Sequence, residues 1–413
     1  MKRKLLKQIS NEWRSNLWLA VELLIISSVL WYIMDYVGVF SSLSSESMGV
    51  DTDHVYQLTI KSKPEDSPTF EPYTEEEGSW TQFERVMNRL REHPDIEYVA
   101  SGSNAVYNYN FSGTWANPVD ALPDSAVLIT DRNNRFWVTS DYPKVFNMHG
   151  INGETPEQLA SVLEEGKLII TSNAAGGSMT PRDLLNLRVT LGNDSSTVYT
   201  IGAVVEPIRR SEFEPAWHTT TLIPSNNINE VYFRVKPEAD RDFARRLLEE
   251  SGKSLNYGNM YVADVYSFDT IRENLHHDDY AQQRNMYVCM GFLLLTVFLG
   301  ILGTFWFRTQ QRAKELAIRI TAGATRRQLF ARLIGEGLLL LVIVTPLALG
   351  LDWLITYYNF NASTQYWGQD AWPLQLKAAA IVFGCMAVMI IGGILFPALR
   401  AMKIEPAVIL GGE

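Results

Sequence analysis

Cysteine is nearly absent from this sequence. Its 413 residues include only Cys289 and Cys385, and each lies in a strongly apolar run. The long polar stretch at 41–280 contains no cysteine, so disulfide bonds cannot hold it together. At about 240 residues, this stretch is long enough to fold around a hydrophobic core of its own.

A complete phosphate-binding loop is also missing. Residues 250–254 read ESGKS, but the loop pattern requires glycine where Leu247 stands, and a predicted helix precedes them instead of a strand. The stretch GGSMT at 176–180 has Thr180 where a nucleophile elbow needs glycine. We therefore expect no enzyme activity in this chain, and we expect any nucleotide hydrolysis in another polypeptide.

The histidines give no metal-ligand pattern. The stretch HHDD at 276–279 is contiguous, and contiguous residues on a helix cannot all face one ion. We interpret it as a solvated helical stalk that leads into an apolar run. The remaining four histidines show no ligand spacing, so no metal or other cofactor is expected on this chain.

Charge is scarce in four long apolar runs. A helix needs about 20 residues to cross a hydrocarbon core of about 30 Å, and each run is long enough. The first is longer than a usual signal core and lacks a small-residue cleavage site, so we interpret it as a retained anchor. The predicted transmembrane helices are 17–40, 285–307, 338–358 and 378–399.

Basic residues flank these runs unevenly. They occur in the N-terminal segment 1–16, in 308–337 and in the C-terminal tail 400–413, whereas residues 359–376 of the loop at 359–377 have no Lys or Arg. By the positive-inside rule, the basic segments and both termini are cytoplasmic. The polar stretch is then periplasmic, and it carries most of the acidic excess behind the net charge of -10. This excess does not require a partner, and we expect no binding of nucleic acid.

The polar stretch has a mixed α/β pattern. Strand-like alternation at 54–62 is followed by a helical pattern at 79–94 and another strand, and a comparable strand and helix occupy 230–252 before a strand at 260–268. A segment rich in strands and turns separates the two units, at about 121–225. We predict a membrane protein with four transmembrane α-helices and a large mixed α/β periplasmic domain, 41–280, inserted between the first and second helices.

The basic segment 308–337 has a helical pattern of its own. Ala313, Leu316, Ala317 and Ile320 share one helical face, and Arg312, Glu315 and Arg319 share another. This pattern predicts an amphipathic helix against a membrane surface or a partner.

A sharp corner should follow this helix. Gly323 comes just after the last periodic residue, where a left-handed cap needs glycine. Thr325 and Gln328 then have the spacing of a capping box for a new helix. Such a corner can transmit force, whereas a flexible loop would absorb it.

The same segment is similar to the FtsX-like permease domain. Its signature combines an [RK]-x-x-E-[IL]-[AG]-I-R stretch with G-A-[ST]-R ahead of a span that begins with Glu. The end of the fourth run matches the family ending, and KLIITSNAA with VYTIGAVVEPI resembles a MacB-type periplasmic domain. The matching residues are Arg312, Glu315, Ile318, Arg319, Gly323, Ala324, Thr325, Arg326, Glu336, Pro397, Arg400, Ala401, Pro406 and Leu410.

The resemblance implies a permease subunit of the cell inner membrane. No nucleotide-binding domain precedes the first run in this sequence, so we expect a separate cytoplasmic ABC ATPase that binds ATP and Mg²⁺, and a second permease in a homo- or heterodimer. The permease would couple ATP hydrolysis to periplasmic motion for export or extraction of a substrate. The coupling residues would be Arg312, Glu315, Arg319, Gly323, Ala324, Thr325, Arg326, Arg327 and Glu336.

Two other function classes compete with transport. A membrane scaffold could transmit the same motion to a periplasmic partner, such as a cell-wall hydrolase or a sensor, and a periplasmic adaptor is also an open alternative. An ectoenzyme anchored by its spans lacks a recognisable catalytic constellation. The sequence leaves the substrate open.

Three carboxylates lie within the predicted spans. Glu22 and Asp35 are near opposite ends of the first span, and Asp352 is near the outer end of the third. Charged groups at membrane depth are often functional, but these are close enough to the interfaces to reach water. Both a special role and simple solvation by water stay open.

Overall fold

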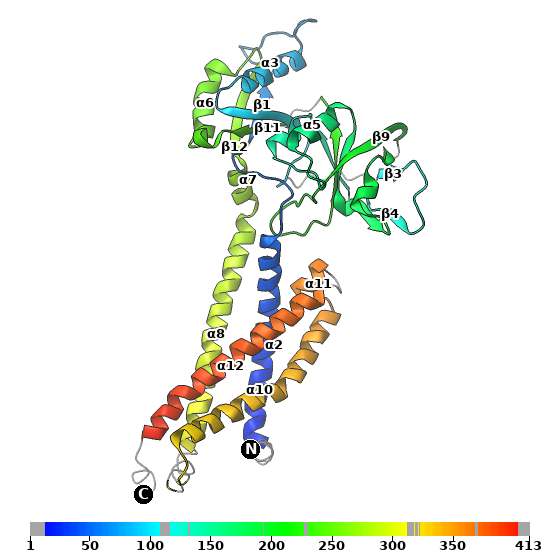
Figure 1. Ribbon diagram of the computed structural model, residues 1–413. Coiled ribbons are helices and arrows are strands. Elements are labelled where there is room, and N and C mark those ends of the chain that lie inside the picture. Colours follow the sequence, from blue (N-terminus) through cyan, green and yellow to red (C-terminus); the bar gives the residue numbers. More distant parts are fainter. Residues whose placement is uncertain are drawn as a thin grey trace. The chain divides into compact units, whose positions relative to one another are not determined.

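The chain folds into two compact units in a computed structural model. The structure describes residues 13–107, 116–130, 133–192, 194–226, 230–311, 318, 321, 323–367 and 371–403. One unit, called here the helical unit, comprises Met1–Ser44 and Asp279–Glu413, and the other, the α/β unit, is Ser45–Asp278 (Figure 1). The α/β unit is therefore inserted in the sequence after the first long helix, as expected.

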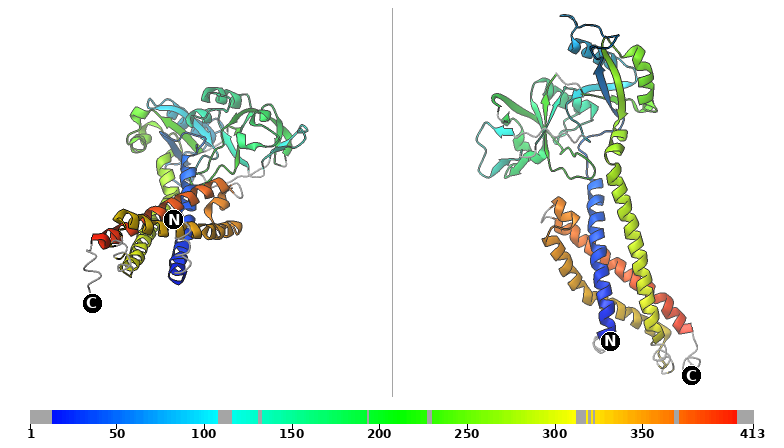
Figure 2. Two further views of the ribbon diagram at one scale, coloured as in Figure 1. Left: turned by 60° about the horizontal axis from the view of Figure 1, so that its bottom comes forward. Right: turned by 180° about the vertical axis from the view of Figure 1, so that it is seen from behind.

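The helical unit is built from long apolar helices. Within the described residues, four helices are long and apolar enough to cross a membrane, and α10 contains Pro346. The start of α2, the end of α8, the start of α10 and the end of α12 lie at the same end of the unit (Figure 2). The helices are α2 (Trp13–Ser45), α8 (His277–Gln311), α10 (Arg326–Tyr357), the short α11 (Ala362–Trp367) and α12 (Trp372–Lys403).

Most of the core of the helical unit comes from α2, α10 and α12. Leu23, Leu341, Met386 and Ile390 are fully buried or nearly so in this core. The candidate span in α8 is far less buried than the other three within the chain. α2, α10 and α12 therefore form the packed part of this unit.

The α/β unit contains a ten-stranded sheet in the order β12-β1-β11-β2-β5-β10-β6-β9-β8-β3. Its first four strands are antiparallel, and their hydrophobic cluster includes residues of helices α3 (Ser79–Arg91) and α6 (Phe243–Ser254). These strands are β12 (Met260–Ser267), β1 (Val55–Ser62), β11 (Glu230–Val235) and β2 (Ile96–Gly102). β1 lies between two strands from the far end of the domain, so the two predicted strand and helix units are joined in one half-sheet.

The other half of the sheet is mixed. β5 pairs with β10 and β6 with β9 in parallel, and a single pair, Gly102 with Val138, joins this half to β2. The strands are β5 (Asn133–Val138), β10 (Thr219–Pro224), β6 (Leu168–Thr171), β9 (Asp194–Val205), β8 (Arg188–Leu191) and β3 (Ala116–Pro118), with β4 (Ala126–Leu128) and β7 (Ala175–Gly177) in a separate pair. The remaining helices are α4 (Tyr142–Val145), α5 (Pro156–Glu164), α7 (Phe268–Leu275), and the 3-10 turns η1 (Ser172–Ala174), η2 (Pro181–Leu184) and η3 (Pro237–Ala239).

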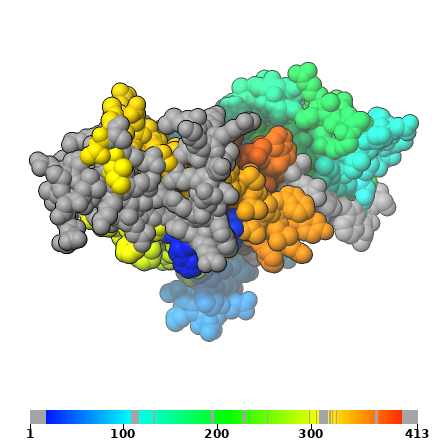
Figure 3. All heavy atoms as spheres, turned by 90° about the horizontal axis from the view of Figure 1, so that it is seen from below, coloured from blue at the N-terminus to red at the C-terminus, as the bar shows by residue number. Residues whose placement is uncertain are grey.

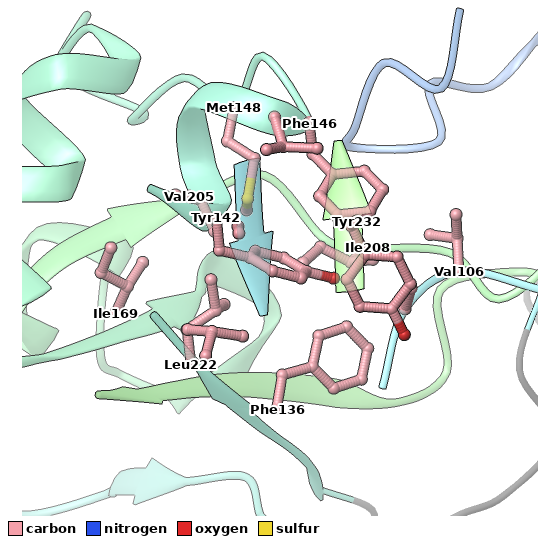
Figure 4. Packing of buried hydrophobic residues seen from close by; sticks show 14 of the residues in the cluster. Val106, Phe136, Tyr142, Phe146, Met148, Ile169, Val205, Ile208, Leu222 and Tyr232 are labelled. Atoms are coloured by element: carbon pink, nitrogen blue, oxygen red, sulfur yellow. The ribbon is translucent and has the colours of Figure 1, made fainter. Parts of the chain in front are cut away.

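An aromatic core connects the two halves of the sheet. Tyr142 of α4 contacts Phe146 and Tyr232 of β11, with ring centroids 4.5 and 6.0 Å apart, respectively (Figure 4). Phe136 of β5 and Phe268 of α7 belong to the same cluster. The cluster draws on both half-sheets, so it supports the sheet where strand pairing is weakest.

The two stretches that partly match catalytic motifs, at 250–254 and 176–180, belong to regular secondary structure and to turns. Glu250–Ser254 forms the last turns of α6, so it has no strand before it and makes no phosphate-binding turn. Gly176 pairs with Val127 in the two-stranded β4-β7 sheet, and Thr180 caps η2.

Candidate functional site

The turn before α10 has the geometry that its sequence predicts. Gly323 has a φ of +92°, in the left-handed region that side chains disfavour. A Cβ atom built on Gly323 meets nothing within 4 Å, so the requirement for glycine comes from the backbone and not from crowding. The prediction of a left-handed glycine at this corner is confirmed.

A capping box then starts α10. The backbone N–H of Gln328 donates to Thr325 Oγ1 at 3.3 Å, and the N–H of Thr325 donates to Gln328 Oε1 at 3.1 Å. These two bonds satisfy backbone donors that a helix start leaves free. The predicted capping box is confirmed, and it fixes the direction of α10 two residues after Gly323.

The first turns of α10 carry the basic residues of this site. Arg326 is the first helical residue, Ala324 is half-buried, and Arg327 is exposed. Further along, Arg332 Nε lies 3.4 Å from Glu336 Oε1, and the Glu336 side chain is only 13% exposed. Figure 3 looks onto the helical unit from this end, with α2 in blue, α8 in yellow-green to yellow, and α10 in yellow to orange.

Three coupling residues predicted from sequence, Arg312, Glu315 and Arg319, lie outside the described residues. Between them, the Ile318 side chain is 56% exposed, and Thr321 donates its hydroxyl to the Ile318 carbonyl at 2.8 Å. The amphipathic helix of this segment stays a prediction.

Asp35 does not reach water as the sequence suggested. Its residue is 0% exposed, and its Oδ2 accepts hydrogen bonds from the Ser363 N–H at 2.9 Å and from Asn361 Nδ2 at 3.3 Å. Gln375 of α12 donates to Ser363 Oγ at 3.2 Å. Asp35 therefore joins α2 to α11 and α12 through buried polar contacts, which is a structural role.

Asp352 is also buried, contrary to the sequence expectation. The residue is 5% exposed, and its neighbouring hydroxyl is Ser28 of α2. Within the described part of the chain, its Oδ1 has no hydrogen-bond partner. Packing of α2, α10 and α12 therefore shields Asp352.

Glu22 is half-buried on α2. Its Oε1 would lie 3.1 Å from a Cβ atom built on Gly300 of α8. Glu22 thus packs against α8 at Gly300, where the absence of a side chain leaves room for it. Glu22, Asp35 and Asp352 each have different neighbours in the structure. These three residues do not form a shared acidic site.

A buried polar cluster contacts both ends of the α/β unit, and it was not predicted from the sequence. Arg209 follows β9 and donates Nη1 to the Glu46 carbonyl at 2.9 Å, Nη2 to the Glu212 carbonyl at 3.0 Å, and Nε to the Glu214 carbonyl at 3.0 Å. Arg209 is 2% exposed. The segment that enters the unit after α2 is therefore bound to the loop after β9.

The same loop also contacts the end of the unit. His276 is fully buried, with Nε2 3.6 Å from Glu212 Oε2, and Tyr107 donates its hydroxyl to Glu212 Oε1 at 2.8 Å. The prediction that HHDD is a solvated stalk is therefore wrong for His276, although His277 is exposed. The loop after β9 thus holds both ends of the α/β unit.

Electrostatics in this cluster follow from burial. Burial lowers the pKa of Arg209 from its usual value, and the charges of Glu46 and Glu212 oppose that change. Burial raises the pKa of Tyr107 well above its usual value, and the charge of Glu212 adds to this effect. Tyr107 therefore stays a neutral hydroxyl that donates to Glu212.

Comparison with known proteins finds a family match within the helical unit. Residues 287–406 match the model of the FtsX-like permease C-terminal domain. The chain is 27% identical over 152 residues to the macrolide export ATP-binding/permease protein MacB of Escherichia coli, and equally to MacB 2 of Escherichia coli O1:K1 / APEC. The matched stretch covers 36% of this chain and 23% of each relative, so it spans about a quarter of the curated relatives. These matches support the resemblance carried by the turn before α10: residues 287–406 are similar to the FtsX-like permease domain, and part of the chain is similar to MacB.

Proposed function

We propose that this chain is a permease subunit that couples ATP hydrolysis by a separate cytoplasmic ATPase to motion of the α/β unit. The observation that carries the proposal is the turn Gly323–Thr325, where a left-handed glycine and a capping box fix the start of α10. A force applied to the basic segment before α10 would be passed on to the start of that helix, because the joint has little freedom to bend. The resemblance to a macrolide exporter supports export or extraction as the outcome.

The proposed setting is the inner membrane, with the four apolar helices spanning it. The ends of α8, α10 and α12 nearest the basic segments lie at one end of the helical unit, together with the start of α2 (Figure 1). That end would face the cytoplasm under the positive-inside rule, and the α/β unit would be periplasmic. The Lys/Arg-free loop before α12 fits the opposite side.

Motion would enter the α/β unit through its two ends. α2 leads into Glu46, which Arg209 binds, and α8 begins next to His276, which Glu212 contacts. Because Arg209 and Glu212 belong to one loop after β9, a shift of either helix would reach the mixed half of the sheet. This arrangement supports mechanical transmission as the role of the chain.

The ATPase partner is the part of the proposal that an experiment can test directly. The chain should be coexpressed with the ABC ATPases of its own organism, purified through a tag, and assayed for vanadate-sensitive hydrolysis. We expect an ATPase to copurify and to be stimulated by the wild-type chain, and Arg327→Glu should weaken this association because it reverses an exposed charge beside the turn. The matched control is Arg241→Glu, which reverses an exposed charge in the α/β unit.

Two outcomes would count against this function. Hydrolysis by the purified chain with no other polypeptide present would overturn the permease assignment. The ATPase could also associate normally with Arg327→Glu and with a double variant, Arg326→Glu, Arg327→Glu. That result would show that the basic start of α10 is not part of the docking surface. If association and stimulation occur but no substrate moves in reconstituted vesicles, the scaffold alternative would be favoured.

A further inference from the structure

A small hollow lies between α2, α10 and α12 around Asp352. It has a volume of about 20 Å³, which is room for one water molecule. Its polar lining consists of Ser27 and Trp31 of α2 with Thr345 and Asp352 of α10, and the remaining lining is apolar. Thr345 already donates its hydroxyl to the Leu341 carbonyl at 2.7 Å. Asp352 is therefore the one acidic group that the described residues place in the wall of the hollow.

Three buried polar atoms near this hollow lack partners. In the described part of the chain, Asp352 Oδ1, Ser28 Oγ and Thr356 Oγ1 make no hydrogen bond. Thr356 lies one helical turn after Asp352, and Ser28 is the hydroxyl that faces Asp352 from α2. Buried polar atoms are normally satisfied, so this group indicates a missing proton, water molecule or ion.

Among the described residues that line the hollow, none carries a positive charge that could balance Asp352. The residues that line the hollow include no Lys, Arg or His and no second carboxylate. An ionised carboxylate in such surroundings is costly, and the usual response of the group is to become neutral. Asp35, the other buried carboxylate of α2 and α10, also has an Oδ1 without a hydrogen-bond partner in the described part of the chain, but two donors hold its Oδ2.

We propose that Asp352 is a proton-binding site, completed by Ser28 and one water molecule. A protonated carboxyl gains an O–H donor, which can bind Ser28 Oγ or the water, while the water can bind Asp352 Oδ1. Protonation thus satisfies Asp352 Oδ1 and Ser28 Oγ without any added charge. A metal ion would need several oxygen ligands, and the hollow provides too few of them.

The site connects two helices that serve different parts of the molecule. Ser28 belongs to α2, which leads into the α/β unit, and Asp352 belongs to α10, which begins at the Gly323 turn. If α2 and α10 separate, water enters and the carboxyl loses its proton. Helix movement and protonation are then linked, and this link does not depend on which ATPase or substrate the permease uses.

Infrared spectroscopy of the full-length protein in lipid vesicles tests the protonation state. The carbonyl stretch of a protonated carboxyl is separate from the carboxylate bands, so wild type at about pH 7 should show a band that disappears in Asp352→Asn. The band should persist in Asp35→Asn, which is the matched control. Loss of the band in Asp35→Asn instead, or no difference between wild type and Asp352→Asn, would overturn the proposal.

Labelling with dicyclohexylcarbodiimide provides an independent measurement. This apolar reagent modifies protonated carboxyls in membrane proteins, and mass spectrometry of peptides locates the adduct. Labelling of Asp352 should exceed that of Asp35 and fall about tenfold per pH unit once deprotonation dominates. Protection by sodium ions at constant pH would show a cation site and refute the proton site.

Discussion

Arg209 Nη1 lies 2.9 Å from the carbonyl oxygen of Glu46, and the two residues are 163 positions apart in the chain. The same guanidinium binds the carbonyls of Glu212 and Glu214, so one buried side chain satisfies three backbone acceptors. Arginine is suited to this task because its planar group offers several donors in fixed directions. The contact fastens the entry to the α/β unit onto the loop after β9.

Replacement of Arg209 should destabilise the α/β unit. Arg209→Met keeps most of the side-chain volume but leaves three carbonyls without their donor, and each loss costs about 1 kcal/mol or more. We expect the free energy of unfolding to fall by about 3 kcal/mol. The measurement is urea unfolding of a fragment spanning residues 45–278, which has three hydrophobic clusters of its own.

The control for this experiment is Arg241→Met. The Arg241 side chain is 93% exposed, so its loss should change stability by less than about 0.5 kcal/mol. Equal stability of the two variants would mean that the carbonyls bound by Arg209 find other partners.

A β-branched residue at Gly323 should uncouple the permease. Gly323→Val forces a side chain into the left-handed region at a cost of about 1 to 3 kcal/mol, so the corner would change direction. We expect ATPase association to persist while substrate movement, or the stimulation of hydrolysis, falls. Copurification and activity are measured on the same preparation.

Gly335 provides the matched control for this variant. A Cβ atom built there also meets nothing within 4 Å, but Gly335 lies inside α10 and has no positive φ. Gly335→Val should therefore retain far more activity than Gly323→Val. Similar losses in both variants would show that a bulkier side chain, and not the backbone of the corner, explains the effect.

Local patterns predicted local structure well in this chain. The strand at β1, the helix at α3 and the capping box at Thr325 each depend on residues within one or two turns of one another. Gly323 could be assigned because few other residues tolerate its backbone conformation. The short helices α4 and α5 and the interleaving of β1 between β12 and β11 were not anticipated.

Contacts between residues that are far apart in the chain could not be predicted from the sequence. Asp35 and Ser363 are 328 positions apart, and nothing near Asp35 indicates that an amide will meet it. His276 was misassigned because its neighbours are polar, whereas Glu212 and the aromatic rings of Tyr107 and Phe213 come from other elements. Arg209 is followed by another arginine and by acidic residues, and such a pattern is typical of an exposed segment. Its burial depends on the fold of the loop.

Glu230 should make the α/β unit less stable as the pH rises. Burial raises the pKa of Glu230, and the hydrogen bond that Tyr232 donates to it at 2.6 Å only partly offsets this. The folded state therefore keeps a proton that the unfolded chain has released. This contribution to stability is lost as the pH rises from the usual glutamate pKa through the folded value.

The comparison of wild type with Glu230→Gln isolates this effect. Glutamine keeps an acceptor for Tyr232 but cannot titrate. Unfolding free energies of the 45–278 fragment between about pH 4 and about pH 7 should show the variant gaining stability relative to wild type as pH rises. A constant or shrinking difference would mean that Glu230 ionises freely in the folded unit.

Loss of Asp35 should loosen the helical unit. Asp35→Ala leaves the Ser363 N–H buried without its acceptor and removes one of the two acceptors of Asn361 Nδ2, which keeps Ser363 Oγ, at a cost of about 1 to 3 kcal/mol. Thermal unfolding of the full-length protein in detergent should show a lower midpoint for this variant than for Glu22→Gln, whose residue is only half-buried. Asp35→Asn should fall between them, because the amide oxygen can still accept one of the two bonds.

The proposed orientation predicts which positions are accessible from outside the cell. In a background with Cys289→Ser and Cys385→Ser, a cysteine at position 241 replaces an arginine whose side chain is 93% exposed, and one at position 318 replaces an exposed isoleucine near the turn. If the α/β unit is periplasmic, a membrane-impermeant maleimide should label Arg241→Cys in cells with a permeabilised outer membrane and spare Ile318→Cys. After the inner membrane is disrupted, both positions should react, which shows that the second thiol is available. The reverse order of labelling would place the α/β unit in the cytoplasm, and the basic turn before α10 could then not meet an ATPase there.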